Sequence, residues 1–161
     1  MSGLGTKKTI KLTQEGLAEL QAELLELVDV KLPEAVKRLA NARSHGDLSE
    51  NSDYQNAKEE QQLIEARIDE VQEILTNAQV VKHTTSHEQV GMGSVVTVSL
   101  SGKKGKTFTY HLVGEFEADP KEGKISADSP LGLALLGKKP GDQIKVSAPA
   151  GEVSYLIEKI Q

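Results

Sequence analysis

The sequence lacks cysteine and tryptophan, and its only aromatic side chains are two phenylalanines and three tyrosines. Without cysteine the chain forms no disulfides and no thiolate metal sites, which is typical of a reducing compartment. The few aromatic rings argue against a large globular core and favour helices packed through Leu, Ile, Val and Ala. No apolar run reaches the length of a signal peptide or of a transmembrane helix. We therefore expect a cytoplasmic protein without a membrane partner.

Acidic charge is concentrated in the first half of the chain. The net charge of -5 arises within residues 1–82, whereas the charges of residues 83–161 balance to zero. Such a chain lacks the broad basic surface that is usual in nucleic-acid-binding proteins, although a local basic patch is compatible with it. The residue pattern changes at the same place, from helical spacing to alternation rich in Gly, Ser, Thr and Val. We predict two domains, residues 1–80 and residues 81–161.

In the first domain, apolar residues recur at the spacing of two long helices that pack against each other. We call the positions that form this contact the seam. Thr13 suits the N-cap of the first helix, and Pro33 should kink that helix or start a new turn. The seam positions of the first helix recur every three or four residues with one shift: Leu17, Leu20, Leu24, Leu27, Leu32, Ala35, Leu39 and Ala42. Those of the second helix alternate strictly between three and four: Tyr54, Ala57, Gln61, Ile64, Ile68, Val71, Leu75 and Ala78. The pattern predicts an antiparallel coiled-coil hairpin that reaches roughly 40–45 Å.

The residue pattern of the second domain predicts β-strands and one short helix. Residues 94–101 and 106–113 alternate on either side of a glycine-lysine turn, which predicts a β-hairpin. Residues 129–137 begin with Ser-Pro and end with Gly, which is typical of a short capped helix. Two further strands are expected at residues 143–148 and 152–160. The fold class is therefore α+β, with a twisted antiparallel sheet that carries one helix.

Residues 44–51 form the bend between the two long helices, and they include two acids, Asp47 and Glu50. An Asp followed three residues later by Glu is a capping-box arrangement, and Gly46 suits a left-handed helix end. A cap does not by itself require two acids at the far end of a long arm. Basic side chains also lie within a few turns of the bend on both helices: Lys37, Arg38, Arg43 and Lys58. The acidic run that starts at Glu59 continues towards the base, so the arm is polarised.

Two carboxylates beside basic side chains suit phosphate chemistry assisted by Mg²⁺. Protein carboxylates often supply only one or two of the oxygen ligands of this ion, and water and phosphate complete its shell. Asp47 and Glu50 are too few to build a full metal site, but they could complete one that another protein provides. The neighbouring Lys and Arg groups would then hold a phosphate chain.

Three segments resemble the GreA/GreB family of bacterial transcript cleavage factors. The first is ARSHGDLSENSDYQNAKEEQ at residues 42–61, followed by NAQVV at residues 77–81. The other two are GEFEADPKEGKISADSPLGLALLGKKPGD at residues 114–142 and APAGEVSYLIEKI at residues 148–160. Within this family, the absence of a long basic face on the arm is more similar to the GreA branch than to the GreB branch. The resemblance also implies that the second domain is FKBP-like.

The resemblance implies that the coiled coil enters the secondary channel of RNA polymerase and that the globular domain docks at its mouth. Asp47 and Glu50 match the tip acids that help to hold a second Mg²⁺, shared with the polymerase, and that position the attacking water. The polymerase would then cleave backtracked RNA itself, so this protein is expected not to be a complete enzyme. We expect it to act as a monomer.

The resemblance also implies contacts away from the tip acids. Arg43 and Lys58 match basic positions that contact the 3′ segment of the nascent RNA, and we add Lys37 and Arg38 from their position near the bend. Ser49 stands where some relatives have a basic residue. A second group, which falls in the region associated with polymerase docking, is Asp119, Ser129 and Pro130; a turn and a helix cap explain these three residues equally well.

Three other interpretations are open. The FKBP-like domain could be a peptide-binding or prolyl isomerase module, with walls from Phe108, Tyr110, Phe116 and Tyr155, two of which we expect on opposite faces. The protein could bind the channel and inhibit the polymerase without cleavage, although intact tip acids argue against this. It could also be an inert coiled-coil adaptor. His83 and His87 are four residues apart but lack a third convergent ligand, so we expect no metal site there.

Overall fold

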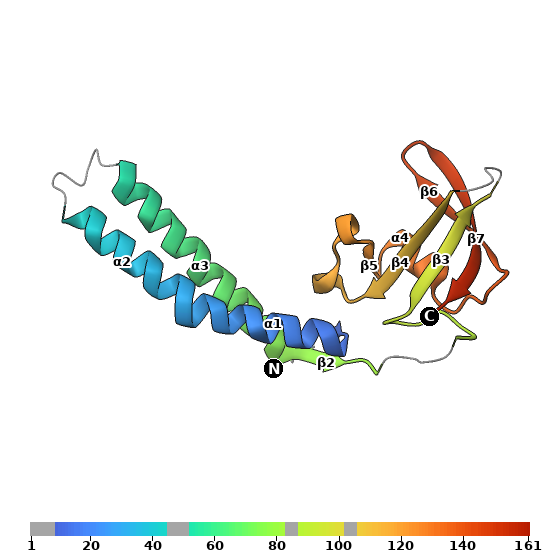
Figure 1. The fold of residues 1–161 in the computed structure, drawn as a ribbon, viewed down its shortest axis with the longest axis horizontal. Helices are drawn as coiled ribbons and strands as arrows, with labels where there is room; N and C mark the ends of the chain where they lie inside the picture. The colour runs from blue at the N-terminus through green and yellow to red at the C-terminus, as the bar shows by residue number, and fades with distance from the viewer. Residues whose placement is uncertain (1–8, 45–51, 83–86, 102–105) are drawn as a thin grey trace, which may run out of the picture. The chain divides into compact units, whose positions relative to one another are not determined.

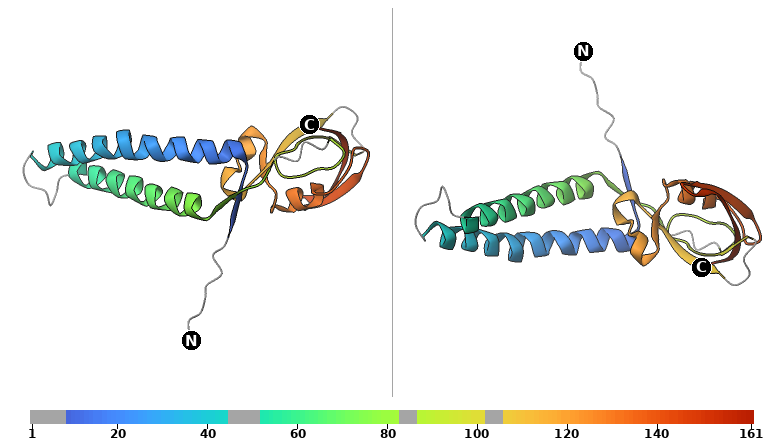
Figure 2. Two further views of the ribbon diagram at one scale, coloured as in Figure 1. Left: turned by 90° about the horizontal axis from the view of Figure 1, so that it is seen from below. Right: turned by 90° about the horizontal axis from the view of Figure 1, so that it is seen from above.

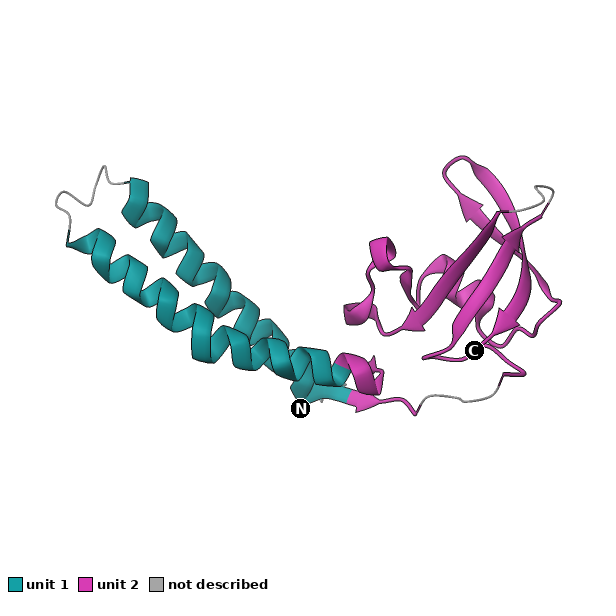
Figure 3. Ribbon diagram, viewed as in Figure 1, with its two compact units in different colours: residues 1–8, 17–78 teal, residues 9–16, 79–161 magenta. Residues whose placement is uncertain are grey.

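The computed structural model describes residues 9–44, 52–82, 87–101 and 106–161. It contains two compact units, which Figure 3 distinguishes by colour. One unit consists of residues 1–8 and 17–78, and the other of residues 9–16 and 79–161. The second unit therefore includes a short segment from the start of the chain, which contains the first turn of the first long helix.

The first unit is a helical hairpin. Its outgoing side is one continuous helical stretch made of α1 (Gln14–Glu26), the π-helical turn η1 (Leu27–Lys31) and α2 (Leu32–Arg43). The returning side is α3 (Ser52–Asn77), which has 26 residues and is therefore about 39 Å long. The views of Figures 1 and 2 show the two sides lying next to each other along their length. The predicted antiparallel hairpin is confirmed.

The predicted seam holds the two sides of the hairpin together. Each seam position deduced from the sequence is buried or half-buried in the structure. The most completely buried of them are Leu20, Leu27, Ala35, Ala57, Ile68 and Val71. Small residues such as Ala35 and Ala57 let the helices approach closely, and the larger ones supply most of the apolar area removed from water. Off the seam, Ile74 is also buried, whereas Leu25 and Leu63 are exposed, with 62% and 72% of their surface accessible.

The π-helical turn explains the one irregular step in this seam. Between Leu27 and Leu32 the seam advances by five residues instead of three or four. A π-helical turn closes through hydrogen bonds five residues apart, and the Leu32 N–H donates to the Leu27 carbonyl. The wider turn thus absorbs one extra residue and keeps both leucines on the seam. It lies directly before Pro33, whose missing N–H and bulky ring disturb a regular helix at this point.

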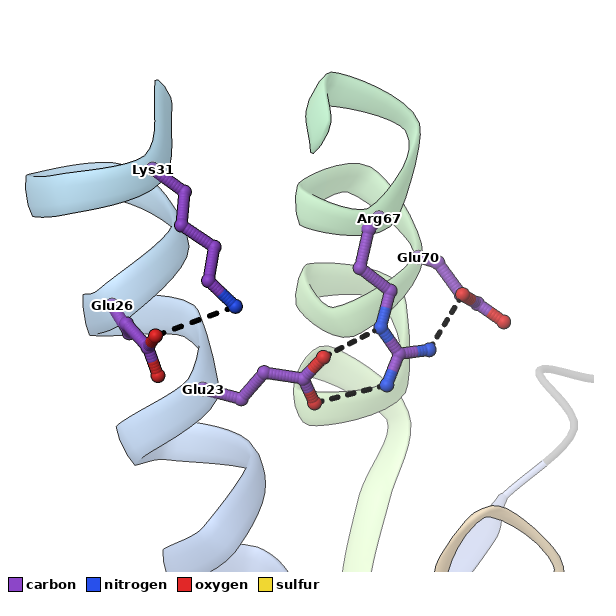
Figure 4. Close-up of polar contacts among 5 residues, drawn as sticks. All are labelled: Glu23, Glu26, Lys31, Arg67 and Glu70. Atoms are coloured by element: carbon purple, nitrogen blue, oxygen red, sulfur yellow. Dashed lines mark hydrogen bonds and ion pairs between the residues drawn. The ribbon is translucent and has the colours of Figure 1, made fainter. Parts of the chain in front are cut away.

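Ion pairs reinforce the hairpin on either side of the seam (Figure 4). The Arg67 guanidinium on α3 donates two hydrogen bonds to the Glu23 carboxylate on α1, at 2.7 and 2.9 Å, and a third to Glu70 at 2.7 Å. These hydrogen bonds from Arg67 hold the pKa of Glu23 below its usual value, because they favour the charged carboxylate. The two carboxylates in turn raise the pKa of Arg67. Lys31 pairs with Glu26 at 3.3 Å within the first side.

A carboxylate in the second unit caps the start of α1. Strand β1 (Ile10–Leu12) pairs with β2 (Ala78–Val80), and Thr13 follows β1 as the predicted N-cap, with its Oγ1 accepting a hydrogen bond from Gly16 N–H at 3.0 Å. Thr13 donates its own N–H at 2.9 Å, and its hydroxyl, to the Glu117 carboxylate. Gly114 N–H donates to the same carboxylate at 3.0 Å. A Cβ atom at Gly16 would collide with this carboxylate, so the position requires glycine.

The rest of the second unit is a five-stranded sheet in the order β5-β4-β3-β7-β6. The strands are β3 (Val95–Leu100), β4 (Thr107–Val113), β5 (Lys124–Ser126), β6 (Gln143–Ala148) and β7 (Gly151–Ile160). The predicted strands match β3, β4, β6 and β7, which pair antiparallel. The structure adds β5, which runs parallel to β4 and makes the sheet mixed. Three residues of unremarkable sequence carried too little alternation to reveal this strand.

A helix covers part of one face of this sheet and closes its core. Helix α4 (Pro130–Leu135) begins at the predicted N-cap, Ser129, and ends before Gly137, whose φ of 75° is the left-handed conformation that favours glycine. Two short 3-10 helices, η2 (Glu115–Glu117) and η3 (Pro120–Glu122), connect β4 to β5. The core consists of Val90, Val96, Val98, Leu112, Leu135, Ile144, Ile157 and Ile160. It is aliphatic, as the shortage of aromatic residues predicted, and the α+β fold class is confirmed.

The Glu23–Arg67 pair predicts a pH-dependent contribution to the hairpin. Glu23→Gln should lower the free energy of unfolding by about 0.5–1 kcal/mol at neutral pH, a discounted value because both side chains are more than a third exposed. The folded-state pKa of Glu23 is depressed, so its contribution is present above the unfolded-state pKa. It should disappear as the pH falls through the folded-state pKa. Urea denaturation followed by circular dichroism at 222 nm over a series of pH values measures both effects.

Glu26→Gln is the matched control for this experiment, because Glu26 lies on the same side of the hairpin but pairs only with the exposed Lys31. It should change stability by less than Glu23→Gln does. A destabilisation by Glu23→Gln that persists unchanged in acid would contradict the assigned charge interaction.

The cap at the start of α1 predicts an unusual response to alanine. Gly16→Ala should destabilise the second unit by about 1–3 kcal/mol, because the new Cβ displaces a carboxylate that accepts three hydrogen bonds. Helix propensity alone would predict a gain of up to about 1 kcal/mol. Hydrogen exchange at the Thr13 and Gly114 amides should accelerate in the variant. Protection equal to that of the wild-type protein would show that Glu117 does not hold these two amides.

Candidate functional site at the end of the hairpin

The described part of the hairpin stops on either side of the bend. Helix α2 ends at Arg43, and Ser44 terminates it by donating its N–H to the carbonyls of Ala40 and Asn41. Helix α3 begins at Ser52. The two predicted tip acids, Asp47 and Glu50, lie outside the described residues. Their assignment therefore stays a prediction from the sequence.

The structure describes the four basic residues that were predicted to contact RNA. Lys37, Arg38 and Arg43 lie on the last two turns of α2, and Lys58 lies on the second turn of α3. All four are exposed. Each lies within roughly 10 Å of its helix end, at 1.5 Å per residue. The hairpin thus gathers four cations from both helices next to the bend.

One of these cations is already engaged within the hairpin. The Arg38 Nη1 lies 2.6 and 2.7 Å from the two carboxylate oxygens of Glu60 on the facing helix. No ion pair to another described residue is found for Lys37, Arg43 or Lys58. The acidic stretch that starts at Glu59 therefore reaches into the basic zone. Among the described residues, Lys37, Arg43 and Lys58 are therefore available without breaking an ion pair, and Arg38 is not.

The Arg38–Glu60 pair lies at a shallow surface cleft of about 510 Å³ between α2 and α3. Its lining residues are Lys31, Glu34, Arg38, Asn56, Glu59, Glu60, Leu63 and Ile64. Three of these are acids and two are bases, so the surface that surrounds Arg38 is locally acidic. The cleft is open to solvent.

A Mg²⁺ ion shared with another protein at the bend stays a prediction from the sequence. Among the residues that the structure describes, no group of three His, Asp or Glu side chains is placed to hold a metal ion. Asp47 and Glu50 supply carboxylate oxygen, the ligand type that Mg²⁺ prefers. Two such residues require further ligands from elsewhere.

The predicted docking residues lie in the second unit, where Asp119 bonds to Lys124 and Ser129 bonds to Ser126 at the two ends of β5. The Asp119 side chain caps η3 by accepting a hydrogen bond from Lys121 N–H at 2.9 Å. The Ser129 hydroxyl accepts from Gly132 N–H at 3.0 Å and donates to the Ser126 carbonyl at 2.6 Å. Pro130 is the exposed first residue of α4. The Ser129 hydroxyl therefore acts both as a donor and as an acceptor within the cap.

The aromatic residues of the second unit are arranged differently from our expectation. Phe108 and Tyr110 lie two residues apart on β4, which puts them on one face of the sheet, and their rings stack at 6.2 Å. Tyr155 on β7 meets Phe108 edge to face at 6.3 Å. Burial, reinforced by the neighbouring Tyr155, raises the pKa of Tyr110. Tyr110 and Tyr155 pack against the core, whereas Phe108 keeps 39% of its surface accessible. These contacts give the isomerase interpretation no direct support.

Sequence reasoning missed the partner of Arg38 and the role of Glu117. The available signal for Glu60 was the register of the hairpin, because Arg38 and Glu60 lie at similar distances from the bend. For Glu117 the sequence offered no signal, since its partner Thr13 is separated from it by 104 positions along the chain.

A two-helix hairpin with basic residues near its bend, together with a small mixed α+β unit, defines a class of two-domain proteins. Residues 10–80 match the family model described as transcription elongation factor, N-terminal. Residues 85–161 match the model described as transcription elongation factor, GreA/GreB, C-term. The chain therefore belongs to the GreA/GreB family of transcription elongation factors, and the resemblance seen in the sequence is confirmed.

Individual relatives agree with this assignment over nearly the full length. The chain is 45% identical over 158 residues to transcription elongation factor GreA of Listeria monocytogenes, which covers 98% of each chain. It is 46% identical over 147 residues to transcription elongation factor GreA of Acidiphilium cryptum, which covers 91% of this chain and 93% of the relative. Among solved structures, GreA factor homolog 1 (Gfh1) of Thermus thermophilus is 33% identical, with 96% and 99% of the two chains covered and a TM-score of 0.44.

Within the described residues, no helix has the length and apolar composition needed to cross a membrane.

The hydrogen bonds of Ser129 predict that its cap contributes to the stability of the second unit. Ser129→Ala should lower the unfolding free energy of the second unit by about 1 kcal/mol, because Gly132 N–H loses its acceptor. Ser129→Thr keeps the hydroxyl and should restore most of this loss. Thermal unfolding of the two variants measures the difference. Equal stability of Ser129→Ala and wild-type protein would show that the cap contributes nothing.

Proposed function

We propose that this protein stimulates RNA polymerase to cleave backtracked nascent RNA and thereby rescues arrested elongation complexes. The observation that carries the proposal is the end of the hairpin, where exposed cations from both helices flank a bend whose sequence supplies two carboxylates. Cations hold phosphates, and carboxylates hold Mg²⁺ and orient water. Membership in a family of transcription elongation factors supports the same function.

The length of the arm supports a role inside the polymerase. Helix α3 alone spans about 39 Å, and the described part of the hairpin buries a single seam between its two sides. We propose that the arm enters the secondary channel of the polymerase and that the second unit docks at the mouth of that channel. In this role the protein acts as a monomer in the cytoplasm. The partner is the polymerase, and the nucleic acid contacted is the 3′ segment of the nascent RNA.

Asp47 and Glu50 are the residues that we assign to the reaction. They would hold Mg²⁺ jointly with the polymerase and keep a water molecule oriented towards the RNA phosphate. When bound, the ion neutralises phosphate charge and lowers the pKa of its water. The protein thus contributes part of a site and is not a complete enzyme.

Arg43, Lys58 and Lys37 are the cations that we assign to the RNA backbone, together with Arg38 once it is released from Glu60. Their side chains are exposed and come from both helices, so they would flank an RNA strand that passes the bend. We assign docking to the surface around Asp119, Ser129 and Pro130. The hydrogen bonds of the first two fix the shape of that surface.

The tip acids predict a separation of binding from cleavage. Asp47→Ala and Glu50→Ala should bind the polymerase with nearly wild-type affinity but lower the rate of cleavage by at least about tenfold, because each removes an oxygen ligand. The measurement is cleavage of radiolabelled RNA in a stalled, backtracked elongation complex with Mg²⁺. Binding is measured separately by competition with labelled wild-type protein.

Asp69→Ala is the control, because Asp69 is an exposed acid on the same hairpin but lies far along α3 from the bend. It should leave cleavage unchanged. Full cleavage by both tip variants would contradict the proposed mechanism, and binding without any cleavage by the wild-type protein would favour a non-cleaving channel binder.

A further inference from the structure

We propose that Glu60 lowers the affinity of the hairpin for RNA. Its carboxylate forms an ion pair with Arg38 and so competes with the RNA phosphate for this cation. This inference rests on the proposed function, because it assumes that RNA reaches the end of the arm. It assigns to Glu60 a positioning role: Glu60 acts through Arg38 and does not itself contact RNA.

The geometry of the pair makes it a competitor. Both Glu60 oxygens lie within 2.7 Å of the same guanidinium nitrogen, Nη1 of Arg38. A phosphate prefers the same planar guanidinium group and would have to displace the carboxylate or share the cation with it. The carboxylate also repels a phosphate that approaches Arg38. As long as the pair is intact, Arg38 contributes little net positive charge to the RNA-facing zone.

The exposure of the pair makes it reversible. The side chains of Arg38 and Glu60 are 60% and 40% exposed. An ion pair in such a position contributes only about 0.2–1 kcal/mol, because water screens it and both side chains lose rotamer freedom. A phosphate chain held by Lys37, Arg43 and Lys58 can therefore break the pair at modest cost. The open cleft beside the pair leaves room for the freed Glu60 side chain and for the backbone of an extended strand.

The structure offers Glu59 as a matched control for the substitution of Glu60. Glu59 is the neighbouring carboxylate, is exposed and lines the same cleft, but no ion pair to another described residue is found for it. Glu59→Gln and Glu60→Gln change the net charge equally and at nearly the same distance from the bend. Only Glu60→Gln releases Arg38. A difference between the two variants therefore reports the ion pair and not the overall charge of the arm.

The test uses full-length protein in a stalled, backtracked elongation complex whose RNA carries a photoreactive 4-thiouridine at its 3′ end. All proteins in the series carry Asp47→Ala and Glu50→Ala, so that cleavage does not consume the RNA, and the protein with only these two substitutions is the wild-type reference of this test. The readout is the yield of protein–RNA cross-link at saturating protein, measured as a function of KCl concentration. Circular dichroism melting checks that each variant is folded.

Glu60→Gln should raise the cross-link yield roughly two- to fivefold at a salt concentration where the wild-type yield is partial. Its logarithmic salt dependence should steepen by about 0.7, the value for one added phosphate contact on single-stranded nucleic acid. Glu59→Gln should give a markedly smaller rise. In a background with Arg38→Ala, Glu60→Gln should give no gain, because the residue through which it acts is gone.

Three results would overturn the inference. The first is no gain from Glu60→Gln, the second is an equal gain from Glu59→Gln, and the third is a gain that survives Arg38→Ala. Each leaves the proposed function standing if the wild-type arm still forms a cross-link. Failure of every variant to form a cross-link would instead overturn the proposed function, and this inference with it.

Discussion

The seam between the two sides of the hairpin is the constraint on which the rest of the structure depends. An arm of this kind has no interior beyond one apolar stripe on each helix, so any position that rotates off the seam exposes apolar area and loses packing. The stripe of the first side contains a five-residue step between Leu27 and Leu32, and the π-helical turn absorbs it. Because the register is restored beyond that turn, α2 presents Arg38 to Glu60 and carries Arg43 to the bend.

The seam, the caps and most strands could be predicted because they leave local patterns. Leucine and alanine spacing revealed both sides of the hairpin, and Ser-Pro with a later glycine revealed α4. The parallel strand β5 and the Thr13–Glu117 contact could not be predicted, because both depend on segments that meet only after the chain has folded. The shift at Leu32 was visible, but a kink at Pro33 explained it as well as a π-helical turn did.

The sequence predicted which residues make up the candidate site, but it did not predict which of its basic residues form ion pairs. The sequence identifies the cations beside the bend and the acids within it. It does not show which cations are already paired. The structure shows that Arg38 is engaged and finds no ion pair to a described residue for Lys37, Arg43 or Lys58, a distinction that arises from side-chain positions across the seam. A count of basic residues therefore overstates the charge that the arm presents to an anion.

The contacts at the start of α1 have a consequence for dividing the protein into fragments. The boundary in sequence between helices and strands lies near residue 80, yet β1 and the first turn of α1 pack within the other unit. A fragment that begins after residue 80 would leave the Glu117 carboxylate without its Thr13 donors. It would also remove the carbonyl of Leu12 that accepts from Val81 N–H. An independently folding globular fragment therefore has to be assembled from two pieces of chain, with residues 9–16 supplied as a separate peptide or joined by a short linker.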